Sequence, residues 1–357
     1  MQKDEIVKKL KEYINITKEK AKELKVAFVT SILNETIAFK DFEFQSVCTS
    51  YLSREDCDEL IKAFRENDIY TELYIDCEDF FKSYYSGKFN SNIVFETSPK
   101  GIAKGKDALI PSFCDSVGLP HIGPDAASTI RCVNKYQWYC TLKNNSLPVP
   151  KTYLFTNHWV NIPPSKGKYI LKLNEECASI GLTKNSVFVD DLSQMTITAN
   201  ELSEKFKEPL IAQQFISGYE VEVPVLANVN STVILPPIGL KYNNQRFLNN
   251  TFFNYDIIYD NGYGVYIFED ENASINAEIQ EITKKVIDVL NLNGFFRIDF
   301  RVTADGAPYI IDINNDPTLN HEGSFQCSVK SLGFTNKDLI AIILGNYFFN
   351  QSKIEHQ

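Results

Sequence analysis

The chain has 357 residues, 44% hydrophobic and 23% charged, which suits two or three globular domains. Its net charge of −10 argues against a nucleic-acid partner and favours an acidic cytoplasmic protein. No apolar run is long enough to cross a membrane, and the charged N-terminus predicts no signal peptide. The eight cysteines and four histidines show no metal-site spacing, so we expect reduced, mostly buried thiols.

Residues 1–122 alternate between helix and strand patterns. A charged helix is predicted before residue 25, followed by strands at 25–30, 70–75 and 92–95 and by helices at 54–67 and 111–117. This alternation is typical of a parallel α/β domain. No G-x-G-x-x-G follows the first strand, so we do not expect a dinucleotide site there.

Residues 123–208 begin with a helix that Asp125 is placed to cap, followed by a second helix from Asn134 to Lys143. Strands are predicted near Tyr153 and at 168–173, and a turn of small residues follows at 175–181. Lys172 lies in the second of these strands. Taken alone, a lysine in such a strand is usually an edge residue whose charged end reaches solvent.

Residues 209–357 contain two predicted strands within 209–225, separated by a Ser-Gly break. An amphipathic helix is predicted at 278–290, and a final helix at 336–349. Between these helices, the stretch 295–317 reads FFRIDFRVTADGAPYIIDINNDP. Its two halves alternate between apolar and polar residues, which predicts a β-hairpin.

The hairpin carries the strongest chemical signal in the sequence. If Asp305 and Gly306 form a two-residue turn, Asp299 lies directly opposite Asp312, and Arg297 opposite Asn314. Like charges in this position destabilise a sheet, but a hard divalent cation such as Mg²⁺ accepts carboxylate oxygens from both. The alternative is a solvated polar sheet face with a slipped register.

Several short motifs, in order between about residues 118 and 333, resemble the ATP-grasp superfamily and most nearly its D-alanine–D-alanine ligase branch. They are GLPHIGPDAAS, LPVPKT, YILKLNEECASIGL, AQQFISGYEVEV, TFFNYDIIYD and RIDF with IIDINNDP. The resemblance implies an α/β ATP-grasp fold with an N-terminal Rossmann-like (pre-ATP-grasp) domain at 1–122. It also implies a central subdomain at 123–208 and a C-terminal subdomain with a metal site at 209–357.

The resemblance further implies that the chain binds ATP and Mg²⁺, with Mn²⁺ as a possible substitute. Residues 213–216 would hold the adenine edge through their backbone, Glu220 would bind the ribose, and two lysines would reach the phosphates. The expected nucleotide-binding residues are Lys135, Lys172, Glu176, Gln213, Gln214, Phe215, Ile216 and Glu220. The expected metal ligands are Asp299, Asp312 and Asn314.

The implied reaction joins an amino-acid or short-peptide carboxylate to an amine through an acyl phosphate, with release of ADP. Arg297 would stabilise the oxyanion, although a structural salt bridge to Asp299 is its rival role. Ser179 and Tyr259 would join a closing loop at 177–182 to a second loop. The implied partners are small molecules, and a homodimer is the default state by resemblance.

The chain also departs from the family pattern. Residues 177–179 read CAS where the family has a glycine-rich loop, Ile258 replaces a lysine, and Thr318 replaces a glycine. Two N-terminal elements that concern the first substrate are missing, and Glu35 is the nearest candidate for one of them. We therefore expect substrates other than two D-alanines. The alternatives are a nucleotide-binding regulator that has lost ligation, and ligation to the thiol of coenzyme A.

Overall fold

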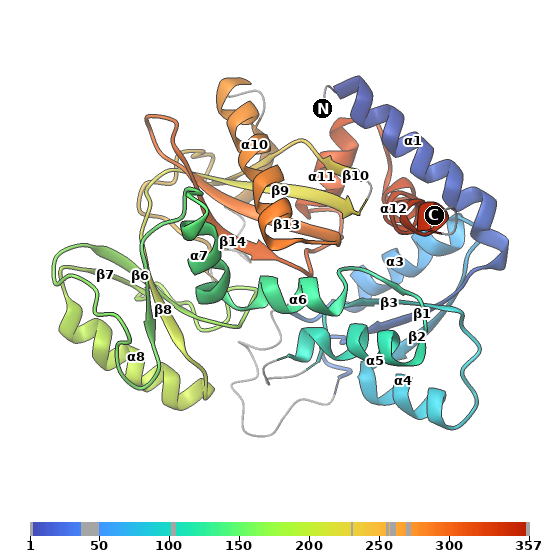
Figure 1. Ribbon diagram of the computed structural model, residues 1–357, viewed down its shortest axis with the longest axis horizontal. Coiled ribbons are helices and arrows are strands. Elements are labelled where there is room, and N and C mark those ends of the chain that lie inside the picture. The colour runs from blue at the N-terminus through green and yellow to red at the C-terminus, as the bar shows by residue number, and fades with distance from the viewer. Residues whose placement is uncertain are drawn as a thin grey trace.

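The computed structural model describes residues 3–36, 50–100, 105–229, 231–254, 257, 262–268 and 273–354. Three β-sheets form separate layers that meet near the centre of the molecule (Figure 1). One sheet is parallel and two are antiparallel. The expected α/β class, with its parallel N-terminal sheet, is therefore confirmed.

The first sheet has the strand order β2-β1-β3-β4, and all its strands are parallel. Its strands are β1 (Lys25–Thr30), β2 (Tyr70–Ile75), β3 (Ile93–Thr97) and β4 (His121–Ile122). Helices connect them because parallel strands require long crossovers. These are α3 (Arg54–Glu66), α4 (Asp76–Tyr85), η3 (Lys106–Ala108) and α5 (Leu109–Val117), after α1 (Lys3–Lys20) and η1 (Ala21–Glu23). Helix α4 is not among the helices that the sequence predicts.

The second sheet has the order β5-β8-β6-β7 and is antiparallel. Its strands are β5 (Thr152–Phe155), β6 (Lys168–Leu173), β7 (Val187–Val189) and β8 (Leu210–Gln214). Helices α6 (Ala126–Val133) and α7 (Lys135–Asn144) lead into it, and α8 (Leu192–Phe206) packs on one face. Asp125 and Asn134 cap α6 and α7 by accepting hydrogen bonds from backbone amides, as expected for Asp125.

The third sheet has the order β12-β11-β9-β13-β14, and β10 also pairs with β9. The strands are β9 (Tyr219–Asn228), β10 (Ser231–Ile234), β11 (Ile238–Tyr242), β12 (Tyr263–Ile267), β13 (Gly294–Val302) and β14 (Pro308–Asn314). The helices are α10 (Ala273–Leu290), α11 (Ser324–Ser331) and α12 (Asn336–Ile354). One face of β9 and β13 packs into a core with α7 and α10, which leaves the opposite face for polar side chains.

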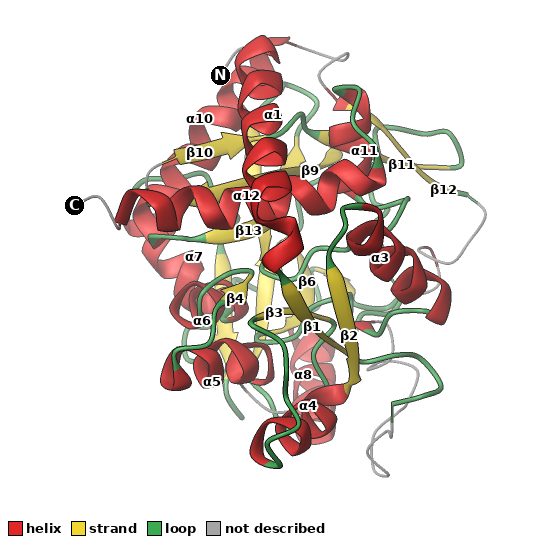
Figure 2. Cartoon of the chain, turned by 90° about the vertical axis from the view of Figure 1, so that its right-hand side faces the viewer, coloured by secondary structure: helices red, strands yellow, loops and turns green. Residues whose placement is uncertain are grey.

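The first and last helices lie side by side, as Figure 2 shows. The hydroxyl of Thr17 on α1 donates to the carbonyl of Ala341 on α12 at 2.7 Å. A Cβ at Gly345 would lie 2.1 Å from the carbonyl oxygen of Tyr13, so only glycine permits this approach. One apolar cluster joins residues of α1, β1 and α3 to residues of β9 and α12. The domain boundaries at 122 and 208 stay a prediction.

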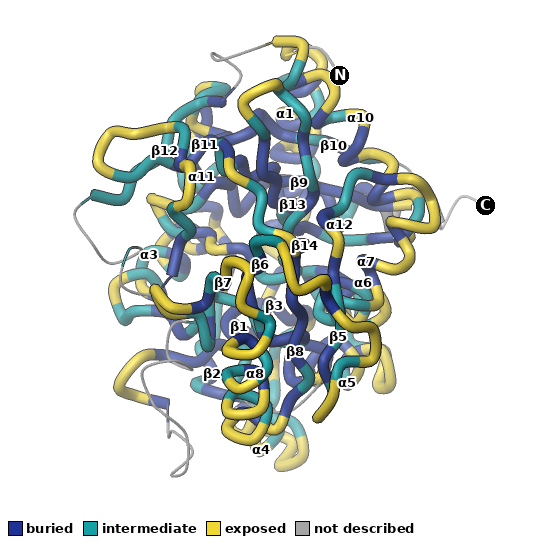
Figure 3. The backbone as a smooth tube through the Cα atoms, turned by 90° about the vertical axis from the view of Figure 1, so that its left-hand side faces the viewer, coloured by how far each residue is buried: buried dark blue, intermediate teal, exposed yellow. Residues whose placement is uncertain are grey.

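Strands β1, β9 and β13 are buried over most of their length, as Figure 3 shows. Helix α10 begins at Ala273, earlier than expected, and α8 and β12 were not predicted from the sequence. Within the described ranges, no helix is both long and apolar enough to cross a membrane.

Candidate active site

A cavity of about 610 Å³ lies where the three sheets meet. Strands β6 and β8 supply one wall, strands β9, β13 and β14 the facing wall, and loops after β1 and β3 line part of it. Every described residue of the expected nucleotide, metal and catalytic sets lines this cavity. Tyr259 and Ile258 lie outside the described residues.

The hairpin of β13 and β14 places two carboxylates face to face. Asp299 pairs with Asp312 and Arg297 with Asn314, so the expected register is confirmed. Asp299 is on β13, which lies between β14 and β9, so it also pairs with Glu222 of β9. Three like charges therefore lie side by side on one sheet face, which is unfavourable without compensating cations.

The predicted two-residue turn of the hairpin is wrong. Thr303 and Ala307 pair instead around the loop 304–306, in which Gly306 adopts a φ of +90°. A left-handed residue is typical of such three-residue loops. The longer loop would move the register, but a bulge after Asp299 inserts one extra residue on β14 and restores the expected pairing.

Arg297 is held between two carboxylates. Its Nε and Nη2 donate to the two carboxylate oxygens of Asp299 at 2.7 and 2.8 Å, and its Nη1 lies 3.2 Å from Glu222. Burial alone would lower the pKa of Arg297, but Asp299 and Glu222 raise it above its usual range. Burial raises the pKa of Glu222 to about 7. The structural ion pair that was the rival role for Arg297 is therefore present.

The two expected phosphate-binding lysines enter the cavity from different elements. Lys135 opens α7, and its Nζ donates to the carbonyl of Glu176 at 2.6 Å and lies 3.7 Å from Asp312. Lys172 on β6 donates to the side-chain oxygen of Gln213 at 3.1 Å. Burial lowers the pKa of Lys172, against the opposing effect of Asp312. Lys172 is therefore not the solvent-reaching edge lysine of the alternative reading.

Another part of the cavity is lined by residues 213–216, at the end of β8, and by Glu220, near the start of β9. Arg301 binds Glu220 at 2.6 Å and also donates to the carbonyl of Thr251 at 2.8 Å. Burial raises the pKa of Glu220, whereas Arg301 opposes that rise. The ammonium group of Lys168 lies 4.0 Å from the ring centre of Phe215, a cation–π distance.

The loop at 177–182 forms a hydrogen bond with the segment between β11 and β12 of the third sheet. The Ser179 hydroxyl donates to the carbonyl of Phe253 at 3.0 Å, so Ser179 contacts the second loop close to the expected place. Ala178 and Ser179 have φ values of +50° and +59°, a conformation that costs non-glycine residues free energy. The backbone thus adopts, with Ala and Ser, the conformation for which glycine is the usual residue.

Some residues at the cavity were not singled out from the sequence. Glu222 and Arg301 share a sheet face with Glu220, Arg297 and Asp299, so the alternation of YEVEV and RIDFR was a usable signal.

Two more residues were missed, and no sequence signal marks them: Asp316 lines the cavity, and Lys106 lies next to it and contacts a lining residue. Lys106 pairs with Glu176 at 2.6 Å, and Asp316 accepts from the Thr97 hydroxyl and the Ser98 amide at 2.7 and 2.6 Å. Burial raises the pKa of Asp316 to about 6.

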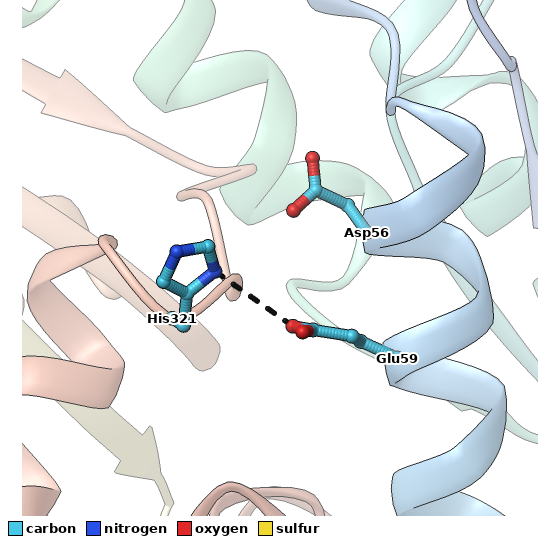
Figure 4. Close-up of side chains that lie close together, drawn as sticks. All are labelled: Asp56, Glu59 and His321. Atoms are coloured by element: carbon cyan, nitrogen blue, oxygen red, sulfur yellow. Dashed lines mark ion pairs between the residues drawn. The ribbon is translucent and has the colours of Figure 1, made fainter.

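Glu35, the candidate for the missing first-substrate element, pairs with Arg54 and is not among the cavity-lining residues. Asp56 and Glu59 of α3 lie close to His321, which belongs to the loop after β14 (Figure 4), and Asp56 and His321 line the cavity. Their ligand atoms lie within 4.8 Å of one another, but these groups are partly exposed and the Glu59–His321 distance is 3.8 Å. We read this cluster as a weak contact between the two segments.

Known proteins resemble this chain in sequence and in fold. The family described as "D-ala D-ala ligase C-terminus" matches residues 168–345. The D-alanine–D-alanine ligase of Aquifex aeolicus is 25% identical over 245 residues, which cover 67% of this chain and 78% of that protein. The ligase of Petrotoga mobilis is 24% identical over 271 residues, which cover 76% of this chain and 84% of that protein.

Solved structures show the fold over nearly the whole chain. A D-alanine–D-alanine ligase from Bacillus anthracis complexed with ATP matches with a TM-score of 0.70 at 14% identity, covering 94% of this chain and 100% of that chain. The D-Ala:D-Ser ligase VanG from Enterococcus faecalis matches with a TM-score of 0.63 at 14% identity, covering 91% and 99%. The three-sheet architecture is therefore that of these ligases.

Proposed function

The chain is a distant member of the D-alanine–D-alanine ligase family within the ATP-grasp superfamily, and from this premise we propose that it is an ADP-forming carboxylate–amine ligase. The observation that carries the proposal is the charge arrangement in the cavity. Lys135 at the start of α7 and Lys172 on β6 face the opposed carboxylates of Asp299 and Asp312. A triphosphate and a divalent cation would complement this arrangement.

Asp299, Asp312 and Asn314 would hold Mg²⁺. All three offer oxygen atoms, the donors that Mg²⁺ prefers, and a cation would relieve the repulsion between the two opposed carboxylates. When bound, Mg²⁺ neutralises negative charge that develops on the phosphates during transfer. Asp312 keeps the charge of the family's usual glutamate but has a shorter reach.

The chain's own residues would bind and orient the substrates. Lys135 and Lys172 would hold the phosphates of ATP, the 213–216 segment and Glu220 would bind the nucleoside, and Glu176 would border the phosphate site. A carboxylate oxygen of the first substrate would attack the γ-phosphorus as the bond to ADP breaks. The amine nitrogen would then attack the acyl carbon and lose a proton, and phosphate would leave with the former carboxylate oxygen.

Arg297 would stabilise the oxyanion formed in the second step. Because Asp299 and Glu222 fix its guanidinium in place, it is ordered before substrates arrive. The loop at 177–182, with Ser179 and Tyr259, would exclude water from the acyl phosphate. The missing first-substrate elements favour an amino acid other than D-alanine as the carboxylate.

Adding paired amino acids is expected to stimulate ADP release from ATP–Mg²⁺. We would measure ADP release with single and paired L- and D-amino acids. A particular pair should raise the rate above either member alone, because both the carboxylate and the amine are needed for turnover. Stimulation by a carboxylate together with a thiol would instead indicate thioester formation. No stimulation by any pair, with ATP still raising the melting temperature, would contradict ligation and support the regulator.

A further inference from the structure

A buried lysine from the part of the chain that forms the first sheet reaches a carboxylate that lines the cavity. Lys106 lies in η3, between β3 and α5, and its Nζ donates to Oε2 of Glu176 at 2.6 Å. Glu176 lies in the segment after β6 of the second sheet, so the pair joins two of the sheets. The two side chains are 5% and 10% exposed, and an ion pair so shielded from water interacts more strongly than one at the surface.

Glu176 also contacts one of the two lysines expected to bind the phosphates of ATP. Its backbone carbonyl accepts a hydrogen bond from Nζ of Lys135 at 2.6 Å, and its side chain lines the cavity. The residue therefore brings a carboxylate close to the place where a triphosphate would lie. Without a cation beside it, this carboxylate would repel the phosphates and weaken their binding.

Lys106 supplies that cation. Among the residues that the structure describes, it is the one lysine or arginine within ion-pair distance of the Glu176 carboxylate. Burial alone would lower the pKa of Lys106, but neighbouring anionic groups, Glu176 and Asp107 among them, keep it above its usual range. The ammonium therefore stays charged although it is buried, and the pair carries no net charge where Glu176 alone would carry one.

We propose that Lys106 neutralises the Glu176 carboxylate and thereby allows the phosphates of ATP to bind beside Lys135. Lys106 is then a positioning residue, which acts through Glu176 and does not itself touch the nucleotide. This inference rests on the proposed function, since it needs the phosphates of ATP at this place in the cavity. A purely structural ion pair is the alternative, and the two roles differ in what each single substitution does to ATP affinity.

The test measures the affinity of the full chain for ATP in the presence of Mg²⁺, by titration calorimetry. Lys106→Met leaves the Glu176 charge without its partner and is expected to weaken ATP binding about tenfold or more. Glu176→Gln removes the negative charge, leaves the Lys106 ammonium near the phosphates, and is expected to strengthen binding about threefold or more. The double variant should recover most of the affinity that Lys106→Met loses, because neither charge is then present.

The matched control is Lys82→Met, at an exposed position on α4, which should keep the wild-type affinity. Weaker binding in both single variants, or wild-type affinity in Lys106→Met, would overturn the role of Lys106 and leave the ATP site standing. Failure of the wild-type protein to bind ATP would refute the proposed function and the inference with it. If Lys106→Met does not fold, Glu176→Gln still decides: tighter binding supports the inference, and unchanged or weaker binding overturns it.

Discussion

Replacing Asp312 with asparagine is expected to slow ADP release at least about a hundredfold while leaving the melting temperature nearly unchanged. Asp312 is partly exposed, and its distance of 3.7 Å from Lys135 is too long for a hydrogen bond. Removing its charge also relieves the repulsion with Asp299 on the facing strand. The side chain therefore contributes little to folding but would contribute a ligand charge to the metal.

Steady-state ADP release and thermal unfolding of the same samples check this result. Asp305→Asn is the matched control, because Asp305 lies in the loop of the same hairpin and is fully exposed. That variant should keep wild-type activity. A large fall in stability for Asp312→Asn, with activity lost only in proportion to unfolding, would make Asp312 a structural residue.

Replacing Arg297 with methionine is expected to abolish ligation and to destabilise the fold by about 3–5 kcal/mol, the usual cost of removing one partner of a buried ion pair. Arg297 is mostly buried, with 17% of its side chain exposed, and is the partner of both Asp299 and Glu222. Without it, the two carboxylates would be buried without a cation. Chemical denaturation measures the change in the free energy of unfolding.

The destabilisation of Arg297→Met should depend on pH. Burial already raises the folded pKa of Glu222 to about 7, above its unfolded value, and removal of Arg297 should raise it further. A carboxyl whose pKa is higher in the folded than in the unfolded protein contributes its full stabilisation at pH values below its unfolded pKa. This contribution is lost as the pH rises through the folded pKa, where the buried carboxyl must ionise. The variant should therefore be closest to wild type near about pH 5 and farthest from it above about pH 7.

Two further variants control for this result. Arg65→Met, at an exposed position on α3, should show neither the loss nor the pH dependence. Adding Glu222→Gln to Arg297→Met should recover part of the stability, because it removes one of the buried charges. Wild-type stability of Arg297→Met at every pH would contradict the buried ion-pair account.

Part of the fold and of the site could be predicted from the sequence. The first three strands of the first sheet and the hairpin were visible because alternation and turn residues are local signals, whereas the two-residue strand β4 was not. The pairing of Asp299 with Asp312 was predicted with the wrong turn, and a bulge that no local pattern announces restored the register. Helix α8 was missed, and its sequence LSQMTITANELSEKF contains threonines and an asparagine that are weak helix formers.

Contacts between distant segments could not be predicted. Lys106 and Glu176 are far apart in sequence, and so are Asp316 and Ser98, yet these pairs join the sheets at the cavity. Such pairs depend on how the three sheets pack, which local propensities do not specify.

The transfer of an oxygen atom from substrate to phosphate tests the central claim most directly. The substrate carboxylate would be labelled with oxygen-18, and the phosphate released during turnover would be analysed by mass spectrometry. Passage through an acyl phosphate predicts phosphate that carries one labelled oxygen, because the attacking carboxylate oxygen leaves with the phosphoryl group. Unlabelled phosphate, released at the same rate as ADP, would contradict the ligase account, since water would then be the group that attacks ATP.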